Sequence, residues 1–368
     1  MIPFWRKKHQ EKEAFVLKNG GILLEQLITI FDGKRNPICN FSSKELKLAT
    51  NNYDTMNVIR DDGYFKLFRG FLPDRQISVM QFKYIDLYDE CINNIVFASQ
   101  MCHKHILKLI GCCLETEVPI LVFESLVKYG TLEDHILNHH KCHLETLSWR
   151  HRLKIAMEIS HTFAYLHLGF PRPIVYSGMS SSLFLLDERC VPKLFDFSFA
   201  QCIPEGETQI KDAELRGTPR YIAPELFKGV LDEKYDVYGF GILLLELLTG
   251  QRITDLVCSM IETEDETETK DEDRKFFARV GDNWPRNFET GKIIYFSDLV
   301  KNINGENCFI VVVDPTIIGD GLCPETRQQI QAFLELVVIK CLSRLGGDRP
   351  SMIDVAKQLK QLYLSASA

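Results

Sequence analysis

The first 40 residues form a leader whose hydrophobic positions differ from those of the rest of the chain. Its one apolar stretch, Ile22 to Phe31, favours a helix that ends at Asp32-Gly33. A second helix is predicted to begin at Ser42, because Ser42 and Glu45 have the spacing of a capping box. In such a box each side chain binds a backbone amide at the start of the helix. We therefore expect residues 1–40 to precede a separate domain.

Two kinds of periodicity follow the leader. From Val58 to Glu124 the apolar residues fall in short runs typical of strands, with one helical stretch near Cys91–Met101. The later part of the chain is helical, most clearly from Trp149 to His167, where apolar residues recur on one face at steps of three and four. This order predicts an α+β fold of two lobes, a small strand-rich N-lobe at 41–124 and a larger helical C-lobe at 125–365.

One segment of the C-lobe breaks the helical pattern. Nearly all residues from Glu262 to Asp273 are acidic residues or threonines. A segment with no apolar face cannot join a core, so we expect a solvated, mobile insertion at about 260–275. A recognition element for a basic partner is the alternative, which we favour less.

Composition and charge exclude several classes of protein. The 368 residues are 45% hydrophobic and 25% charged, which is ordinary for a soluble globular protein. A formal charge of -7 argues against a nucleic-acid-binding protein, because such proteins usually carry a basic face. The 12 cysteines are scattered and follow no signal peptide, which favours reduced thiols in the cytosol or nucleus. The longest apolar run, Gly239 to Leu248, is too short to span a bilayer, so we expect a cytoplasmic protein with no transmembrane segment.

Ordered motifs along most of the chain carry a family resemblance. They lie between Phe41 and Leu362 and comprise Phe41-Ser42-x-x-Glu45-Leu46-x-x-Ala49-Thr50-Asn51-Asn52-Tyr53, His103-x-x-Ile106-Leu107-Lys108-Leu109-x-Gly111-Cys112-Cys113-Leu114-Glu115, Leu147-Ser148-Trp149-Arg150-x-Arg152-Leu153, Gly217-Thr218-x-x-Tyr221-Ile222-Ala223-Pro224-Glu225, Asp236-Val237-Tyr238-x-Phe240-Gly241 and Asp348-Arg349-Pro350. In this order and spacing they resemble the protein kinase domain, in its plant receptor-like cytoplasmic branch. The resemblance implies the two-lobed protein kinase fold, with an activation segment at about 196–225.

The motifs that are retained are mostly structural in that family. The resemblance implies that Glu225 pairs with Arg349, which would lock the end of the activation segment to the C-lobe. It also implies that Asp236 holds the backbone of the catalytic loop. The presence of these three residues implies that the fold is kept.

The positions that phosphoryl transfer needs in the N-lobe are altered. A kinase uses a glycine-rich loop over the phosphates, a strand lysine and a glutamate that holds the lysine. In this sequence the three glycine positions hold Arg60, Asp62 and Phe65. Only the off-pattern Gly63 could let the backbone approach a ligand, and two carboxylates beside it would repel a triphosphate. The lysine position is Met80 and its glutamate partner is Asn94, so the ion pair is lost from both ends.

The catalytic positions of the C-lobe are altered as well. Gly178 stands in place of the catalytic base, Ser180 in place of the phosphate-contacting lysine and Leu183 in place of the metal-binding asparagine. Asp196, in Asp196-Phe197-Ser198, is the one catalytic side chain that survives. A lone aspartate binds magnesium poorly, so we favour a hydrogen-bonding role over a metal site. The sequence therefore predicts a pseudokinase that retains only Asp196 of the catalytic side chains, has no kinase activity and needs no cofactor.

The activation loop offers two threonines, Thr208 and Thr218, as candidate modification or docking residues. In many kinases the arginine before the catalytic aspartate binds a phosphorylated loop residue, but Ser177 stands at that position here. Phosphorylation could not order the loop through that pocket. An exposed bait for other proteins and an idle relic of a kinase loop remain equally open.

The leader carries a narrower resemblance. Its residues Leu17-x-Asn19-Gly20-Gly21-x-Leu23-Leu24-Glu25-Gln26-Leu27-Ile28, with Asp32-Gly33-Lys34 and Asn36-Pro37-Ile38, look like the N-terminus of the ZRK group of plant receptor-like cytoplasmic pseudokinases. The resemblance implies an adaptor or decoy in plant innate immunity, bound to the leucine-rich repeats of a coiled-coil NLR immune receptor. It implies that bacterial effectors are sensed directly or through effector-modified receptor-like cytoplasmic kinases. It also implies a cytoplasmic protein that reaches the plasma membrane only through its partners.

The receptor-binding surface is a further hypothesis. We consider Ile22–Phe31 a candidate, with Leu24 and Leu27 as the residues to test. Packing of the same stretch against the chain's own domain is the alternative, which we slightly favour.

Other functions stay open at this point. One is a non-catalytic nucleotide-binding switch, and another is a residual serine/threonine protein kinase. A cluster of potential zinc ligands occurs at His135, His139, His140, Cys142 and His143. The cluster lies in a polar connection and no second cluster accompanies it, so we favour a solvated loop.

Overall fold

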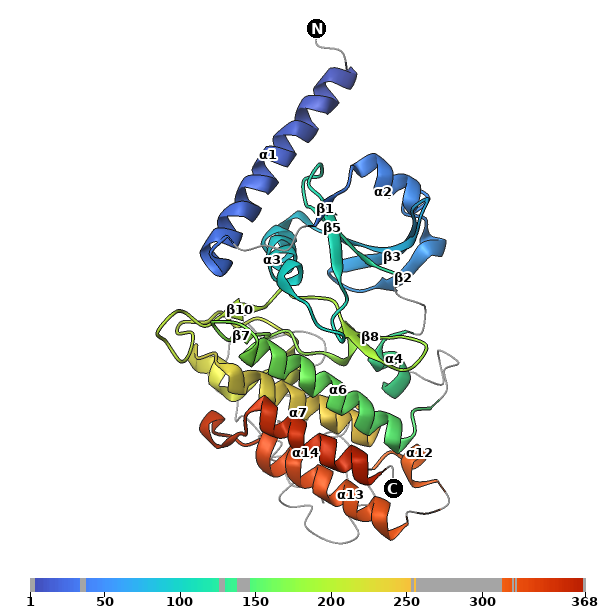
Figure 1. Cartoon of the computed structure of the whole chain (residues 1–368), viewed down its shortest axis with the longest axis vertical. Coiled ribbons are helices and arrows are strands. Elements are labelled where there is room, and N and C mark those ends of the chain that lie inside the picture. The colour runs from blue at the N-terminus through green and yellow to red at the C-terminus, as the bar shows by residue number, and fades with distance from the viewer. Residues whose placement is uncertain are drawn as a thin grey trace, which may run out of the picture. The chain divides into compact units, whose positions relative to one another are not determined.

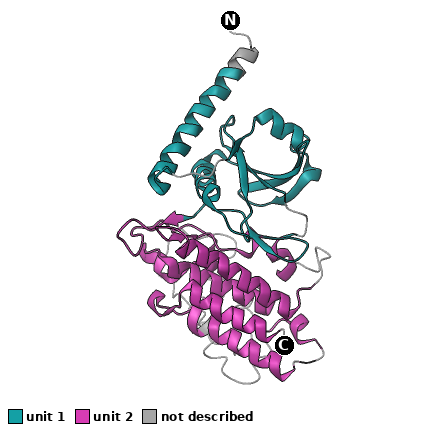
Figure 2. Cartoon of the chain, in the orientation of Figure 1, with its two compact units in different colours: residues 1–130, 185–200 teal, residues 131–184, 201–368 magenta. Residues whose placement is uncertain are grey.

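The computed structural model describes residues 4–33, 38–125, 130–137, 146–252, 255, 313–319, 321 and 323–366. They belong to two compact units, which are taken one at a time (Figure 2). Unit 1 comprises Met1–Gly130 and Leu185–Ala200, and unit 2 comprises Thr131–Phe184 and Gln201–Ala368. The acidic insertion predicted at about 260–275 lies outside the described residues.

Unit 1 is built on a six-stranded sheet of order β1-β5-β6-β4-β3-β2. The strands are β1 (Cys39–Asn40), β2 (Val58–Asp61), β3 (Phe65–Phe71), β4 (Gln76–Phe82), β5 (Leu109–Cys113) and β6 (Ile120–Glu124). All neighbouring pairs are antiparallel except β1 and β5, which are parallel. Gly111 allows this pairing, because a Cβ there would lie 2.3 Å from the Cys39 carbonyl oxygen. A small second sheet pairs β8 (Phe184–Leu186) with β9 (Pro192–Leu194).

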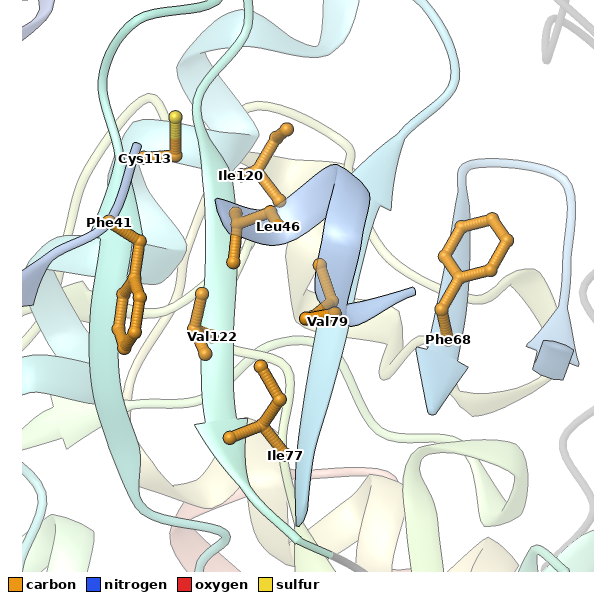
Figure 3. Packing of buried hydrophobic residues seen from close by; sticks show 9 residues of the cluster. Phe41, Leu46, Phe68, Ile77, Val79, Cys113, Ile120 and Val122 are labelled. Carbon is orange, nitrogen blue, oxygen red and sulfur yellow. The ribbon is translucent and has the colours of Figure 1, made fainter. Parts of the chain in front are cut away.

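Helix α2 (Ser43–Ala49) packs on the six-stranded sheet and begins with the predicted capping box. The Glu45 amide donates to Ser42 Oγ at 3.2 Å, and the Ser42 amide donates to Glu45 Oε2 at 2.8 Å. Figure 3 shows Leu46 of α2 beside side chains of β4 and β6. The whole cluster is Phe41, Leu46, Ala49, Phe68, Ile77, Val79, Cys113, Ile120 and Val122. Burial of one such large aliphatic side chain is worth about 1.5–3 kcal/mol, so this cluster holds α2 on the sheet.

Two longer helices complete unit 1, together with the short 3₁₀ turns η1 (Thr55–Asn57) and η2 (Ile85–Leu87). Helix α3 (Tyr88–Gln100) accounts for the helical stretch predicted near Cys91–Met101. Helix α1 (Phe4–Phe31) lies against α3 (Figure 1). It is much longer than the predicted Ile22–Phe31 stretch, because the preceding residues are mostly strong helix formers with too few apolar positions to signal a helix by periodicity.

Polar contacts dock α1 on its own unit. Asn19 is fully buried, and its Nδ2 donates to the carbonyl oxygens of Leu114 at 3.0 Å and Thr116 at 2.8 Å. The Tyr88 hydroxyl donates to Asn19 Oδ1 at 2.8 Å. These bonds satisfy a buried amide side chain, which would otherwise cost the fold stability.

By length and composition alone, one helix in the described part of the chain could cross a membrane, from His9 to Phe31 within α1. No such segment is expected from the sequence, because its longest uninterrupted apolar run, Gly239 to Leu248, is too short to span a bilayer. This segment is interrupted by Lys18, Asn19 and Glu25, and the contacts of Asn19 lie near its middle. Core helices of soluble proteins and N-terminal signal sequences share this length and composition.

Unit 2 is mainly helical. In the part of unit 2 that the structure describes, the helices are α4 (Leu132–Leu137), α6 (Trp149–Leu168), α7 (Glu233–Thr249), α12 (Pro315–Ile318), α13 (Pro324–Leu334), the π-helical η6 (Glu335–Cys341) and α14 (Met352–Ser365). Short 3₁₀ turns are η3 (Ser181–Leu183), η4 (Pro219–Tyr221), η5 (Pro224–Lys228) and η7 (Gly346–Asp348), and β7 (Ile174–Val175) pairs antiparallel with β10 (Gln201–Cys202). Helix α6 contacts both α14 and α7. The strand-rich unit 1 and helical unit 2 confirm the predicted α+β class.

Candidate functional site

Asp196 is the centre of a hydrogen-bonded network in unit 1. It lies two residues after β9 and is buried. Its Oδ1 accepts hydrogen bonds from Asn94 Nδ2 at 2.8 Å, the Ser198 amide at 3.0 Å and Ser198 Oγ at 2.6 Å. All three donors are neutral, so the carboxylate is held by dipoles and not by an ion pair.

Asn94 connects three elements of this network. Its Oδ1 accepts the Phe197 amide at 3.1 Å, while its Nδ2 lies 2.8 Å from Asp196 Oδ1 and 3.8 Å from Met80 Sδ. It therefore ties α3 to β4 and to the segment after β9. The sequence identified Asn94 only as the loss of a glutamate; the structure shows that its amide supplies both a donor and an acceptor.

The neighbouring Asn93 strengthens the same connection, and sequence reasoning missed it. Its Nδ2 donates to the carbonyl oxygens of Phe197 at 3.1 Å, Ser198 at 2.9 Å and Ala200 at 3.0 Å. Two consecutive asparagines on α3 thus fix the backbone around Asp196. The pair Asn93-Asn94 was visible as a polar interruption of an apolar helix face, which is the signal that could have identified it.

Met80 occupies the middle of β4. It pairs in register with Leu67 of β3 and Leu121 of β6, and its side chain is fully buried. A thioether fills irregular core space and brings no charge. The position that the kinase resemblance assigns to lysine is therefore part of the apolar core of unit 1.

Burial changes the acidity of Asp196. Loss of solvent raises the pKa of its carboxyl to about 6, although the hydrogen bonds from Ser198 lower it in part and the charge of Asp62 raises it further. A raised pKa means that the folded protein favours the neutral form of this group.

In the turn between β2 and β3, backbone amides that could bind an anion are already hydrogen-bonded to the carboxylate of Asp62. Oδ1 of Asp62 accepts the backbone amides of Tyr64 at 2.8 Å and Phe65 at 3.1 Å, and the Asp62 amide donates to the Phe65 carbonyl oxygen at 3.1 Å. This is the turn that the kinase resemblance places over the nucleotide phosphates. Its amides already bind a carboxylate, whereas Gly63 faces open space.

Two lysines neutralise the acidic turn. Lys83 Nζ lies 2.5 Å from Asp61 Oδ1 and also donates to the Asp62 carbonyl oxygen, and Lys66 Nζ lies 3.1 Å from Asp61 Oδ2. The hydrogen bond from Lys83, followed by that from Lys66, lowers the pKa of Asp61. The sequence analysis treated the turn as a repulsive acidic patch and missed Lys83, which lies at the end of β4 and is distant in sequence.

The altered C-lobe positions lie in unit 2, in the stretch between β7 and β8. Gly178 follows Ser177, whose amide donates to Asp236 Oδ1 at 3.0 Å. The Ser180 hydroxyl accepts the Ser182 amide at 3.3 Å and lies 2.8 Å from Ser182 Oγ, so it caps η3. Leu183 is buried, as expected of a core residue. These side chains serve the local fold of unit 2.

The scaffold residues named by the resemblance make the contacts that it implies. Both Nη atoms of Arg349 donate to the carboxylate of Glu225, with 2.9 Å between Nη2 and Oε2. Asp236 Oδ2 accepts the Tyr176 amide at 2.8 Å and lies 2.9 Å from His167 Nε2. A bidentate arginine pair and a carboxylate that accepts backbone amides both fix geometry strongly.

The activation segment is anchored at several points in unit 2. Ile210 and Leu231 exchange backbone hydrogen bonds of 2.8 and 3.0 Å. Thr208 is exposed just before this bridge, whereas Thr218 is only half-exposed and its carbonyl oxygen accepts the Tyr221 amide at 3.0 Å. Gly217 is required between them, because its φ is +113° and a Cβ there would lie 2.7 Å from the Ser177 carbonyl oxygen.

A buried polar cluster at the end of the activation segment was not anticipated. The Tyr221 hydroxyl donates to Glu246 Oε2 at 2.6 Å and accepts the Ser181 amide at 3.0 Å. Arg220 lies 3.4 Å from Glu246 and 3.3 Å from Glu133. Burial raises the pKa of Glu246, while Arg220 and the Tyr221 hydroxyl oppose the rise. The cluster joins the activation segment to α7 and α4.

The remaining candidates are the potential zinc ligands and the two leader residues, and only some of them lie within the described residues. Within the ranges that the structure describes, no group of three or more histidine, cysteine, aspartate or glutamate residues could hold a metal. His135 is buried in α4, and His139, His140, Cys142 and His143 lie outside those ranges. Of the two leader residues chosen for a partner surface, Leu24 is 52% exposed and Leu27 is 5% exposed. Leu27 packs within unit 1, so only Leu24 is accessible to a partner.

Comparison with known proteins agrees with this geometry. Residues 80–275 match the family model of protein tyrosine and serine/threonine kinases. The chain is 34% identical to the non-functional pseudokinase ZED1 of Arabidopsis thaliana, over 96% of this chain and 98% of that protein. It is 32% identical to the inactive serine/threonine-protein kinase ZRK12 of the same plant, over 98% of this chain and 82% of that protein. Wall-associated receptor kinase 3 of the same plant is 36% identical, but the match covers only 43% of its length. The chain therefore belongs to the protein kinase family, among its ZRK-type pseudokinases.

Proposed function

We propose that this chain is a catalytically inactive adaptor of plant innate immunity. In this proposal it binds the leucine-rich repeats of a coiled-coil NLR immune receptor and senses bacterial effectors, either directly or through effector-modified receptor-like cytoplasmic kinases. It would act in the cytoplasm and reach the plasma membrane through its partners. The observation that carries the inactivity is the neutral bridge from Asp196 to Asn94, with Met80 beside it.

The bridge supports inactivity because it uses the surviving kinase residue for another purpose. Phosphoryl transfer needs a lysine held by a glutamate, metal ions and a base that orients the acceptor. Here Oδ1 of Asp196 accepts three neutral donors, and Met80 and Asn94 stand where the resemblance places the lysine and its glutamate. Loss of a general base costs roughly 10²–10⁴ in rate. Loss of one stabilising charge costs roughly a further 10²–10³, although such losses are not additive.

The β2–β3 turn supports the absence of nucleotide binding. Oδ1 of Asp62 accepts two backbone amides, as a phosphate oxygen would, and Lys83 Nζ donates to the Asp62 carbonyl oxygen. A nucleotide would have to displace this carboxylate from the amides, and the displaced carboxylate would then repel the phosphates. The names of two relatives, the non-functional pseudokinase ZED1 and the inactive kinase ZRK12, agree with the proposed inactivity.

The adaptor role is supported by the activation segment, whose end is fixed in unit 2 while Thr208 is exposed. Bidentate pairing of Glu225 with Arg349 and the Tyr221–Glu246 bond fix the end of the activation segment, while Thr208 stays exposed. A rigid frame that carries one accessible hydroxyl can report a covalent modification as a change of surface. Because Ser177 replaces the phosphate-binding arginine, the signal would pass to a partner and not to the chain's own catalytic site.

Co-precipitation tests the adaptor role. The purified chain would be incubated with the leucine-rich repeat region of a coiled-coil NLR that binds ZRK proteins, with a ZRK protein of known binding as the positive control. The kinase domain of wall-associated receptor kinase 3 is the matched negative control, because it shares the fold and 36% of the sequence. We expect retention of this chain and not of that control. Loss of this chain under conditions that retain the positive control would contradict the adaptor role.

A separate assay tests inactivity. Transfer of radiolabelled phosphate to the chain itself and to a general kinase substrate would be measured for the wild type and for Asp196→Ala. We expect the same background signal from both proteins. Transfer that the wild type shows and Asp196→Ala lacks would refute inactivity without touching the adaptor role.

A further inference from the structure

Helix α1 presents a second apolar face that its own unit does not cover. Leu17, Leu24 and Ile28 are 78%, 52% and 55% exposed. With the exposed Ala14 and Gly21 they follow steps of three and four residues, which is the spacing of a coiled-coil seam. We call these five residues, Ala14, Leu17, Gly21, Leu24 and Ile28, the outer stripe. Asn19, Leu23 and Leu27 lie on a different face and are buried in unit 1.

Gly21 destabilises the helix, and no contact within unit 1 explains why a glycine is present at this position. No atom lies within 4 Å of the position that its Cβ would take, so nothing in unit 1 requires a glycine there. Glycine inside a helix costs about 1 kcal/mol relative to alanine. A small residue in the centre of an apolar stripe lets the backbone of a second helix come close, which gives Gly21 a function.

The charges beside the outer stripe make it complementary to itself. In an antiparallel pair with Gly21 opposite Leu24 of a second copy, Lys18 of each helix lies beside Glu25 of the other. In a parallel pair Lys18 lies beside Glu13 of the other helix. All three charged residues are exposed. Within its own unit, Lys18 makes a cation–π contact with Tyr88, with Nζ 4.6 Å from the centre of the ring. Lys18 therefore meets an acidic partner in either orientation.

We propose that the outer stripe pairs α1 with α1 of a second copy of this chain. A lipid surface fits the stripe less well, because the stripe is narrow and two of the three charged residues beside it, Glu13 and Glu25, are acidic, whereas membrane-surface helices carry basic flanks. Burial of the three large side chains against their counterparts would remove an apolar strip from water. Figure 1 shows α1 at the outer edge of unit 1, beside α3.

Self-association of the purified full chain tests the proposal. Sedimentation equilibrium over a concentration series should show a monomer–dimer equilibrium. The double variant Leu17→Ser with Leu24→Ser should weaken association roughly tenfold or more, because buried side chains at the centre of an interface dominate its affinity. The matched control is Leu48→Ser with Met56→Ser, two residues of unit 1 that are 74% and 88% exposed and lie outside α1. It should associate like the wild type, and circular dichroism would verify that each variant folds.

Charge reversal decides the pairing. Lys18→Glu alone should reduce association, because it places two glutamates side by side in either orientation. Mixing Lys18→Glu with Glu25→Lys should restore the dimer if the helices are antiparallel, and mixing it with Glu13→Lys should restore it if they are parallel. Restoration by one mixture supports the proposal. Restoration by neither would overturn it.

Two further outcomes would also overturn it. One is a wild-type chain that stays monomeric at every concentration. The other is a monomer that sediments with vesicles containing anionic lipids and is released by the Leu17→Ser, Leu24→Ser double variant, which would assign the outer stripe to a membrane. Both outcomes leave the proposed adaptor role intact, because that role is measured with the receptor repeats and not with a second copy.

Discussion

Replacement of Asp196 by asparagine should stabilise this protein, although the same change removes a metal ligand from an active kinase. The Asn94 amide and the two Ser198 donors all bind Oδ1, and an asparagine oxygen could accept the same bonds. The variant keeps the network and removes the charge. Because burial is the main reason that the pKa of Asp196 is raised, removal of the charge should be favourable.

The magnitude follows from the shift. Burial raises the pKa of Asp196 from its ordinary value of 3.8 to about 6. Each pKa unit corresponds to about 1.4 kcal/mol, so ionisation destabilises the folded state by up to about 3 kcal/mol. Below pH 3.8 the residue is protonated in both states and costs nothing. As the pH rises, the unfolded chain loses its proton first, and the cost grows until it is complete above about pH 6.

Thermal denaturation of both proteins at a series of pH values would measure this effect. A gain of 1 kcal/mol raises the midpoint by about 2–4 °C for domains of 150–250 residues, so the asparagine variant should melt several degrees higher near pH 8. The difference should shrink as the pH falls below about 6. Asp74→Asn is the control, because Asp74 is exposed in the same unit. A variant that melts below the wild type above pH 6, or a difference independent of pH, would refute the reasoning.

Two further predictions concern other parts of the site. Asp62→Ala should speed hydrogen exchange of the Tyr64 and Phe65 amides by roughly tenfold or more, because each loses a bond worth about 1 kcal/mol or more, whereas Asp62→Asn should protect them. Equal exchange in the alanine variant and the wild type would show that the turn does not depend on this carboxylate. Tyr221→Phe should lower the free energy of unfolding by about 1–3 kcal/mol, because it leaves a buried Glu246 oxygen without its donor. Urea denaturation measures this change, and an unaltered midpoint would mean that the bond adds nothing to stability.

Local patterns in the sequence predicted the elements whose signals are local. The capping box at Ser42 placed the start of α2, and the apolar face from Trp149 to His167 placed α6 to within a residue. The extent of α1 escaped prediction for the same reason. Its first half has few apolar positions, and its place on unit 1 depends on Asn19, which bonds to carbonyl oxygens 95 and 97 residues away.

At the candidate site, too, contacts between residues distant in sequence could not be predicted. Motif spacing assigned a residue to each kinase position, including Met80 and Asn94, and these assignments remain predictions. It did not reveal that Asn94 would bind Asp196, because those residues are 102 apart and hydrogen bonding across such a separation leaves no periodic signal. Lys83 was missed because its partners, Asp61 and the Asp62 carbonyl oxygen, lie about twenty residues earlier, at the end of β2 and in the turn that follows it. The sequence thus indicated what had been lost, whereas the structure was needed to show what replaced it.

Equilibrium binding of magnesium and ATP tests the central claim most directly, namely that this kinase fold no longer holds a phosphoryl-transfer site. Thermal stability would be followed as Mg²⁺ and ATP are added together, with the kinase domain of wall-associated receptor kinase 3 as the comparison. A ligand present at a hundred times its dissociation constant stabilises a fold by about 2.7 kcal/mol, so real binding would be visible. The account predicts no shift for this chain. A saturable, magnesium-dependent stabilisation that Asp196→Asn abolishes would contradict it.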